Sequence, residues 1–86
     1  MHAIIRKCDH TGDSVLCEYE TGDERSVEVA QKALGEFLHD CVERYGTKPP
    51  VWARRHGQTD FDPFNLGRDD LALVDQIICQ FPMVGG

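Results

Sequence analysis

The sequence carries little positive charge and no long run of apolar residues. Nine lysines and arginines stand against fifteen aspartates and glutamates, which gives the 86-residue chain a net charge of −6. Nonspecific nucleic-acid binding needs positive potential, so this balance argues against a nucleic-acid partner. The apolar runs are a few residues long, too short for a membrane-spanning helix. The first residues lack a basic segment followed by a long apolar stretch, so we expect no signal peptide and a cytoplasmic protein.

Residues suited to catalysis are also few. Serine occurs only as Ser14 and Ser26, and the chain has neither a G-x-S-x-G motif nor a glycine-rich phosphate loop. Aspartates gather in residues 60–70 but lack the spacing and the final glutamate of a calcium-binding EF-hand loop. A chain of 86 residues makes a single domain with a small core. We therefore expect no enzymatic activity of its own and no cofactor.

The four cysteines permit two interpretations. Cys17, Cys41 and Cys79 fall where apolar residues recur, which favours small buried side chains. Zinc is the alternative, because cysteine and histidine lie two residues apart at positions 8 and 10 and again at positions 39 and 41. Neither pair has the usual spacing of zinc ligands, so we expect no metal site.

Alternating patterns predict a β-hairpin at the start of the chain. Residues 2–8 are rich in apolar side chains, as in a strand. Residues 14–20 alternate, which places Val15, Cys17 and Tyr19 on one face of a second strand. The polar residues between these two segments favour a turn.

The strongest pattern in the chain predicts an amphipathic helix. Apolar residues recur at steps of three and four across residues 27–45. Ser26 is a suitable N-cap, and Gly46 follows the last periodic residue as a left-handed terminator. Residues 26–30 also alternate, so a helix that starts near Gln31 after a further strand is the alternative.

The second half of the chain predicts two more strands. Residues 51–55 alternate, with Trp52 and Arg54 on one face and Arg55 on the other. Residues 76–81 form the last strand, which is among the most apolar segments of the chain.

Three smaller features indicate how these elements meet. Gly35 lies in the middle of the expected helix, where glycine is unfavourable, which suggests close packing against a neighbour. Residues 61–67 contain two phenylalanines, which we expect to fill the edge of the core. Residues 68–71 have the composition of a short turn or a 3₁₀ segment.

The order of elements is hairpin, helix, strand, short turn and strand. We expect an α+β domain of two layers, in which one main amphipathic helix packs on one face of a mixed sheet of four to five strands. The first and last strands are among the most apolar, so we expect them to be parallel neighbours in the centre of the sheet. A flexible tail at residues 83–86 would follow.

A stretch without acidic residues lies at residues 44–59 and holds four basic side chains. An acidic partner could bind such a strip, and a solvated loop is the structural alternative. Tryptophan and arginine are frequent anchors of protein interfaces. Trp52, Arg54 and Arg55 are therefore our candidate contacts for a protein partner.

The order of elements and the end of the chain resemble the ubiquitin-like β-grasp family. The resemblance covers nearly the whole chain and is most specific in residues 65–86. There the spacing of apolar residues before a Gly-Gly is similar to that of ubiquitin, at Leu66, Leu71, Ile77, Cys79 and Phe81. Residues 74–86 also resemble the small sulfur-carrier subunits of molybdopterin synthesis, which end in an apolar strand, a proline, a small apolar residue and Gly-Gly.

This resemblance implies a β-grasp-like fold and chemistry at the carboxylate of Gly86. In that family an adenylating enzyme activates the terminal glycine with ATP, and the acyl group becomes a thiocarboxylate or passes to an amine. The resemblance makes Gly85 and Gly86 the activation tail and makes Phe81, Met83 and Val84 contacts of the partner. A tail without side chains is suited to a narrow active site.

Two functions therefore remain open. The first is a carrier or modifier protein that an adenylating partner enzyme activates at its Gly-Gly. The second is a non-catalytic interaction module that binds another protein through the exposed sheet face or the Trp52–His56 strip, with the Gly-Gly incidental.

Overall fold

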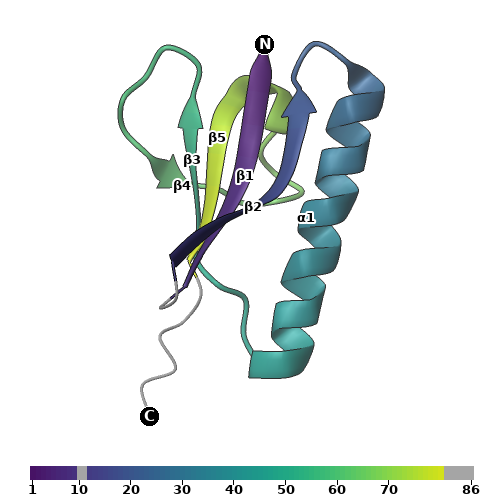
Figure 1. Cartoon of the computed structure of the whole chain (residues 1–86), viewed down its shortest axis with the longest axis vertical. Helices are drawn as coiled ribbons and strands as arrows, with labels where there is room; N and C mark the ends of the chain where they lie inside the picture. The colour runs from purple at the N-terminus through teal and green to yellow at the C-terminus, as the bar shows by residue number, and fades with distance from the viewer. Residues whose placement is uncertain (10–11, 81–86) are drawn as a thin grey trace.

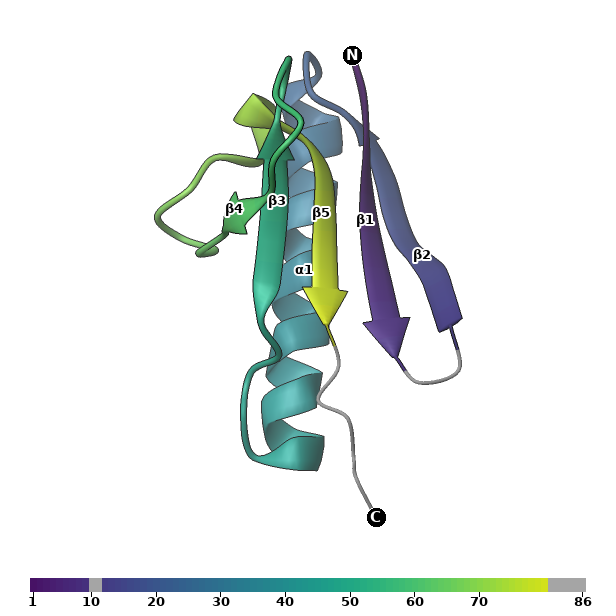
Figure 2. The ribbon, with the colours of Figure 1, turned by 90° about the vertical axis from the view of Figure 1, so that its left-hand side faces the viewer.

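The computed structural model describes residues 1–9 and 12–80, which form a five-stranded sheet with one α-helix on one face (Figure 1). The elements in chain order are β1 (His2–Asp9), β2 (Gly12–Glu20), α1 (Glu24–Tyr45), β3 (Val51–Arg55), β4 (Asp62–Pro63), the 3₁₀ helix η1 (Leu71–Leu73) and β5 (Val74–Gln80). Figure 2 shows the strands in the order β2-β1-β5-β3-β4, with α1 behind them.

The two central strands are parallel, as predicted. β1 and β5 are neighbours, with Ile5 beside Ile77, and both of these side chains are completely buried. The β1–β2, β3–β5 and β3–β4 pairs are antiparallel, so the sheet is mixed. The α+β class is confirmed, and one helix on a mixed five-stranded sheet is consistent with a β-grasp-like fold.

The start of α1 differs from both predicted starts. The helix begins at Glu24, and the N-cap is Asp23, whose carboxylate accepts hydrogen bonds from two first-turn N–H groups at 3.0 and 3.4 Å. The predicted N-cap, Ser26, lies in the first turn, where its hydroxyl accepts the backbone N–H of Glu20 at 2.9 Å. A start near Gln31 is wrong as well, because the capped turn precedes it.

The end of α1 is the one predicted. Gly46 has a φ of 79°, and its N–H donates to the carbonyl of Val42 at 2.8 Å. Gly35 faces the loop between β4 and η1, but without the close packing that its position in the helix interior suggested. A Cβ atom added to Gly35 would lie 3.6 Å from the Leu66 side chain, which is an ordinary contact. Packing against Leu66 therefore does not require a glycine at this position.

A β-bulge changes the faces predicted for the hairpin. Ile5 pairs with Cys17, whereas Arg6 pairs with Val15, so Leu16 is the extra residue in β2. Val15 consequently shares the face of Arg6, opposite α1, and is 50% exposed. The prediction that Val15 shares a face with Cys17 is wrong, because one inserted residue reverses the alternation.

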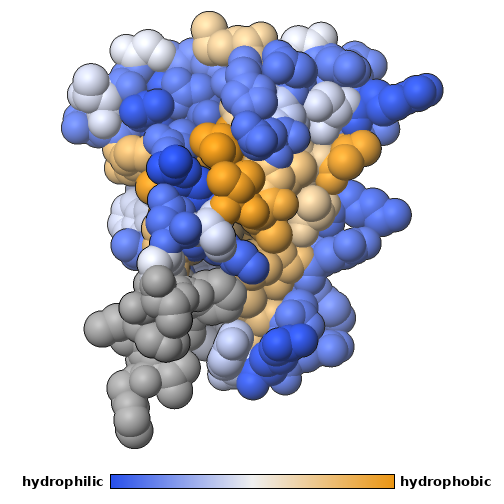
Figure 3. All heavy atoms as spheres, in the orientation of Figure 1, coloured by the Kyte–Doolittle hydropathy of each residue, from blue (hydrophilic) through white to orange (hydrophobic). Residues whose placement is uncertain are grey.

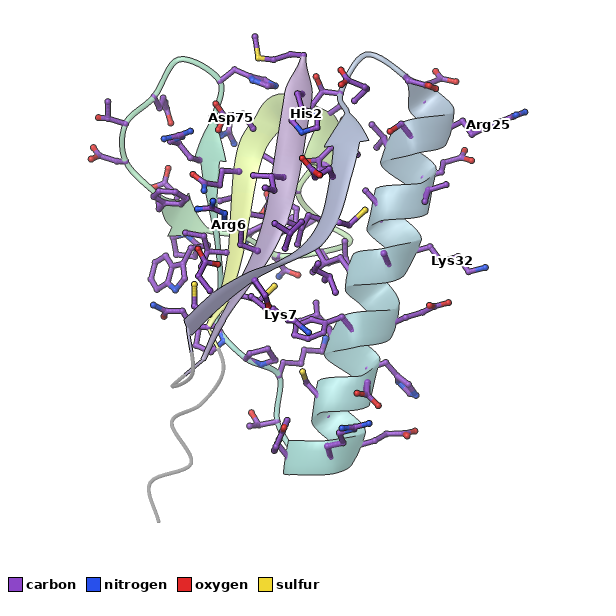
Figure 4. The ribbon with its side chains drawn as sticks, in the orientation of Figure 1. His2, Arg6, Lys7, Arg25, Lys32 and Asp75 are labelled. Atoms are coloured by element: carbon purple, nitrogen blue, oxygen red, sulfur yellow. The ribbon has the colours of Figure 1, made fainter. Side chains whose placement is uncertain are left out.

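The core lies between the sheet and α1. Its main members are buried apolar side chains from both layers: Ala3, Ile5, Tyr19, Ala30, Leu34, Leu38, Ala53, Leu71, Val74, Ile77 and Cys79. Apolar side chains also reach the surface along the seam between β2 and α1 (Figure 3). On the helix side of β1, the ammonium of Lys7 lies 5.9 Å from the ring centre of Phe37 on α1 (Figure 4).

The segment after β3 contains a short strand that the sequence pattern did not predict. In β4, Pro63 pairs with Trp52 at the edge of the sheet, a position where a missing N–H is tolerated. Phe64 is buried at the core edge, as predicted. Phe61 lies outside the core cluster, with its ring centre 5.7 Å from the Arg54 guanidinium. The 3₁₀ helix η1, capped by Asp70, starts at Leu71, the last residue of the segment predicted as a short turn or 3₁₀ segment, and continues to Leu73.

Candidate interaction surface on the open sheet face

The sheet face opposite α1, here called the open face, is not covered by any element of the described residues (Figure 2). The strand register places one row of side chains across it. Arg6 on β1 lies between Val15 on β2 and Ile78 on β5. Ile78 lies beside Trp52 on β3, and Trp52 lies beside Pro63 on β4. This central row therefore joins all five strands.

Most of the central row is apolar. Ile78 and Trp52 are half-buried, and so is Ile4, which precedes Arg6 on the same face of β1. Val15 adds an apolar side chain with half of its surface exposed. An apolar patch with a polar border is the composition expected of a protein-binding surface.

Trp52 is held in place by a hydrogen bond. Its indole N–H donates to the side-chain oxygen of Gln80 at 3.1 Å. Gln80 is the last residue of β5, so the bond joins β3 to the point where the chain continues into residues 81–86. A fixed aromatic side chain with a polar handle loses little entropy on binding, which makes Trp52 a suitable anchor for a partner.

The charge of Arg54 is partly balanced within the chain. Its Nε lies 3.0 Å from Asp75 Oδ1, and the two side chains are 35% and 23% exposed. The guanidinium also lies over Phe61. Arg54 therefore contributes a positioned side chain rather than an unbalanced positive charge.

Arg6 is the charged member of the central row, and Figure 4 shows it on the side of the sheet away from α1. Its Nη1 lies 3.3 Å from Asp13 Oδ2. Its Nε is buried and has no hydrogen-bond partner among the described residues. The side chain as a whole is 39% exposed, so the open part of the guanidinium is suited to an acceptor supplied by a partner.

A cluster of charged groups lies where β1 starts and β2 ends. His2 is 2.8 Å from Glu18 and 3.2 Å from Glu20, and the N-terminal ammonium is 3.5 Å from Glu20. Hydrogen bonds to Glu18 and then to Glu20 raise the pKa of His2. The bond to His2 lowers the pKa of Glu20. The carboxylates of Glu18 and Glu20 are therefore paired with cationic groups of β1 and the N-terminus.

The structure brings two of the predicted contacts together and separates the third. Trp52 and Arg54 lie on the open face, and Arg55 lies on the opposite face because β3 alternates as predicted. Arg44 pairs with Asp40 along α1 at 3.1 Å. The basic residues between positions 44 and 59 therefore do not form one continuous surface.

The other candidate residues lie outside the described residues. They are the five partner-contact and activation residues of the chain end, Phe81, Met83, Val84, Gly85 and Gly86. The expected tail at residues 83–86 lies there as well.

Sequence reasoning did not single out Ile4, Arg6 and Ile78. A signal for the two isoleucines was present, because each is adjacent to another isoleucine in a strand. When Ile5 and Ile77 face the core, their neighbours have to face away from it. Arg6 could not be found in this way, because its position beside Val15 depends on the bulge.

Two of the three cysteines that the apolar pattern predicted to be buried are buried. Cys41 and Cys79 are buried, Cys17 packs partly buried against the core, and Cys8 is half-buried. None of these four described cysteines forms a disulfide. Burial raises the pKa of Cys79 to about 12. In residues 1–9 and 12–80, no three histidine, cysteine or acidic side chains gather as metal ligands, and no helix combines the length and apolar character needed to cross a membrane.

The fold and the open face together define a small α+β domain with a partly apolar, uncovered sheet surface. Comparison with known proteins finds no matching family model, no matching curated protein and no matching solved structure. The function has to be argued from the residues themselves.

Proposed function

We propose that this chain is a ubiquitin-like carrier or modifier that a partner enzyme activates at Gly86. The observation that supports this most is the position of β5. The last strand lies in the centre of the sheet, parallel to β1, and ends at Gln80. Residues 81–86 span at most about 20 Å when fully extended, enough to reach into a partner's active site while the sheet stays outside.

The chemistry would be a two-step acyl transfer. A carboxylate is a poor electrophile until it acquires a leaving group. An oxygen of the Gly86 carboxylate attacks the α-phosphorus of ATP, which forms an acyl adenylate and releases pyrophosphate. A sulfide then displaces AMP to form a thiocarboxylate, or an amine displaces AMP to form an amide. The enzyme supplies the nucleotide site, and this chain supplies the acyl group and a docking surface.

In this proposal the docking surface is the open face. The bond between Trp52 and Gln80 links the central row to the end of β5. A partner that covers Trp52 is therefore close to Gln80, the last residue of β5. Ile4 and Ile78 provide apolar contact area, and the exposed part of the Arg6 guanidinium provides donors for a partner carboxylate.

The direct test is the intact mass of the protein purified from its native host. We expect a fraction in which one oxygen is replaced by sulfur, or conjugates in which Gly86 is amide-linked to another protein. Gly86→Ala adds a side chain at the reacting end and should reduce either product strongly. Gly22→Ala is the matched control, because an added Cβ at this turn meets nothing within 4 Å. If the wild-type chain carries only an unmodified carboxylate and no conjugate forms, the carrier function is wrong.

A non-catalytic interaction module is the second candidate, and the open face itself favours it. The apolar patch of Ile4, Ile78 and Trp52 needs no contribution from Gly86 to bind a partner. A short Gly-Ser extension after Gly86 separates the two functions, because it blocks activation and leaves the sheet unchanged. Full function of the extended chain in its host would favour the module, and loss of function would favour the carrier.

A further inference from the structure

A concave surface lies between α1 and the loop that joins β4 to η1. It encloses a cavity of about 760 Å³, a size in the usual range of binding pockets. The cavity is only half enclosed by its walls. Five of the wall residues supply apolar side chains from three separate segments, α1, β3 and the loop after β4: Leu38, Val42, Val51, Phe64 and Leu66.

The rim of this cavity is basic, although the chain as a whole is acidic. His39, Lys48 and Arg68 line the cavity, and none of its described lining residues is acidic. His39 lies 3.0 Å from Glu43, and Arg68 lies 3.3 Å from Asp69, so both have a carboxylate nearby. Lys48 makes no ion pair within the described part of the chain. Its ammonium is therefore the group on the rim that an anionic partner would meet first.

Gly35 forms part of the cavity wall. Glycine weakens the interior of a helix, and no close contact explains its presence here. A Cβ atom would approach only Leu66, at 3.6 Å, and larger side chains would project into the cavity. The absence of a side chain at this position keeps the cavity open beside Val42, which is 37% exposed.

We propose that this cavity binds an acidic peptide segment of a partner protein, which inserts a bulky apolar side chain against Val42 and Leu66 and places a carboxylate on Lys48. The charge of the rim selects the acidic partner. The half-open shape favours a peptide side chain, because small-molecule sites enclose most of their ligand. This surface meets the open face only at Pro63, which lines the cavity and ends the central row, and the inference does not depend on activation of Gly86.

A random peptide library displayed on phage, selected against the full chain, tests this inference. We expect enriched sequences that combine acidic residues with a large apolar residue. A synthetic peptide of the enriched sequence should shift the amide resonances of Gly35, Val42 and Leu66 in ¹⁵N-labelled protein. Lys48→Glu should weaken the binding of this peptide about tenfold or more.

The matched control is Lys32→Glu, which makes the same charge change on the outer side of α1, where Figure 4 shows Lys32 pointing away from the sheet. It should leave the affinity within about twofold of the wild-type value. Circular dichroism and thermal unfolding of both variants show whether each is folded. Neither variant should affect the modification of Gly86, so this inference and the carrier function can fail separately.

Several results would overturn the inference. Enrichment of basic peptides, peptide-induced shifts on the open face, no enrichment at all, or equal loss of affinity in both lysine variants would each contradict it. If dodecanoate shifts the cavity resonances and no peptide does, the site takes a small anionic amphiphile instead. If peptides bind only to a chain that stops at Gln80, residues 81–86 compete for the cavity and the proposed partner segment is wrong.

Discussion

The hydroxyl of Tyr19 donates a hydrogen bond of 2.8 Å to the carbonyl oxygen of Leu71. The two residues are 52 positions apart, and the bond ties edge strand β2 to the 3₁₀ helix that leads into β5. Both residues are buried, and burial raises the pKa of Tyr19 well above its ordinary value of 10. The hydroxyl therefore remains a donor throughout the usual pH range.

Removing this hydroxyl should destabilise the fold. In Tyr19→Phe the carbonyl of Leu71 loses its buried partner, and we expect the free energy of unfolding to fall by about 1–2 kcal/mol. Urea denaturation measures the change. Tyr45→Phe is the control. Tyr45 is 47% exposed, so water can solvate whatever group its hydroxyl contacts when the hydroxyl is removed. Equal effects of the two variants would show that the bond between Tyr19 and Leu71 contributes no more to the free energy of unfolding than an exposed tyrosine hydroxyl does.

Two glycines of α1 and its C-cap should respond to alanine with opposite signs. Gly35→Ala improves helix propensity without a clash, and we expect the free energy of unfolding to rise by about 0.5–1 kcal/mol. Gly46→Ala forces a side chain into the left-handed region, where φ is 79°, and should lower the free energy of unfolding by about 1 kcal/mol. Urea denaturation of both variants checks this pair. A loss of stability in Gly35→Ala would contradict the expectation that the added Cβ makes only an ordinary contact with Leu66.

Periodicity predicted the elements whose buried side chains follow a regular local pattern. β1 and β5 are buried in the centre of the sheet, and α1 buries one long stripe, so their patterns could be recognised locally. The N-cap could not be chosen in the same way, because Asp23 and Ser26 are both suitable caps. The structure uses Asp23 as the cap and leaves the hydroxyl of Ser26 to accept the N–H of Glu20.

The candidate surfaces were only partly predictable. Alternation in β3 correctly separated Trp52 from Arg55. The bulge at Leu16 has no local sequence signature, and it decides that Val15 joins Arg6 on the open face. The cavity beside Gly35 is built from three stretches of the sequence, so no single stretch indicates it.

Cys79 should react very slowly with alkylating reagents in the folded protein. Its thiol is completely buried, and burial raises its pKa to about 12, so the reactive thiolate is scarce near neutral pH. Mass spectrometry after iodoacetamide treatment should find Cys79 unlabelled in buffer and labelled in urea. Cys8, which is half-buried on the open face, is the internal comparison and should be labelled earlier. Rapid labelling of Cys79 in buffer would contradict its burial in the core.

The contacts of His2 give the fold a pH dependence whose sign follows from two pKa shifts. Folding raises the pKa of His2 above 6.5. The protonated imidazole therefore contributes its full share to the free energy of unfolding below pH 6.5, and this contribution is lost as pH rises through the pKa of the folded state. The pKa of Glu20 is lowered below 4.5, so its contribution is complete above pH 4.5 and is lost as pH falls through the folded-state value. Both residues therefore contribute fully to stability only between pH 4.5 and pH 6.5.

The variant Glu18→Gln tests this assignment at its largest contact. It removes the charged acceptor that lies 2.8 Å from His2 Nε2, so the pKa of His2 should move back toward 6.5. A titration of the His2 ring protons by NMR measures the shift in both proteins. Because these side chains are exposed, added salt should reduce the wild-type shift as well. A His2 titration that is the same in Glu18→Gln and in the wild type would show that Glu18 does not hold the imidazole.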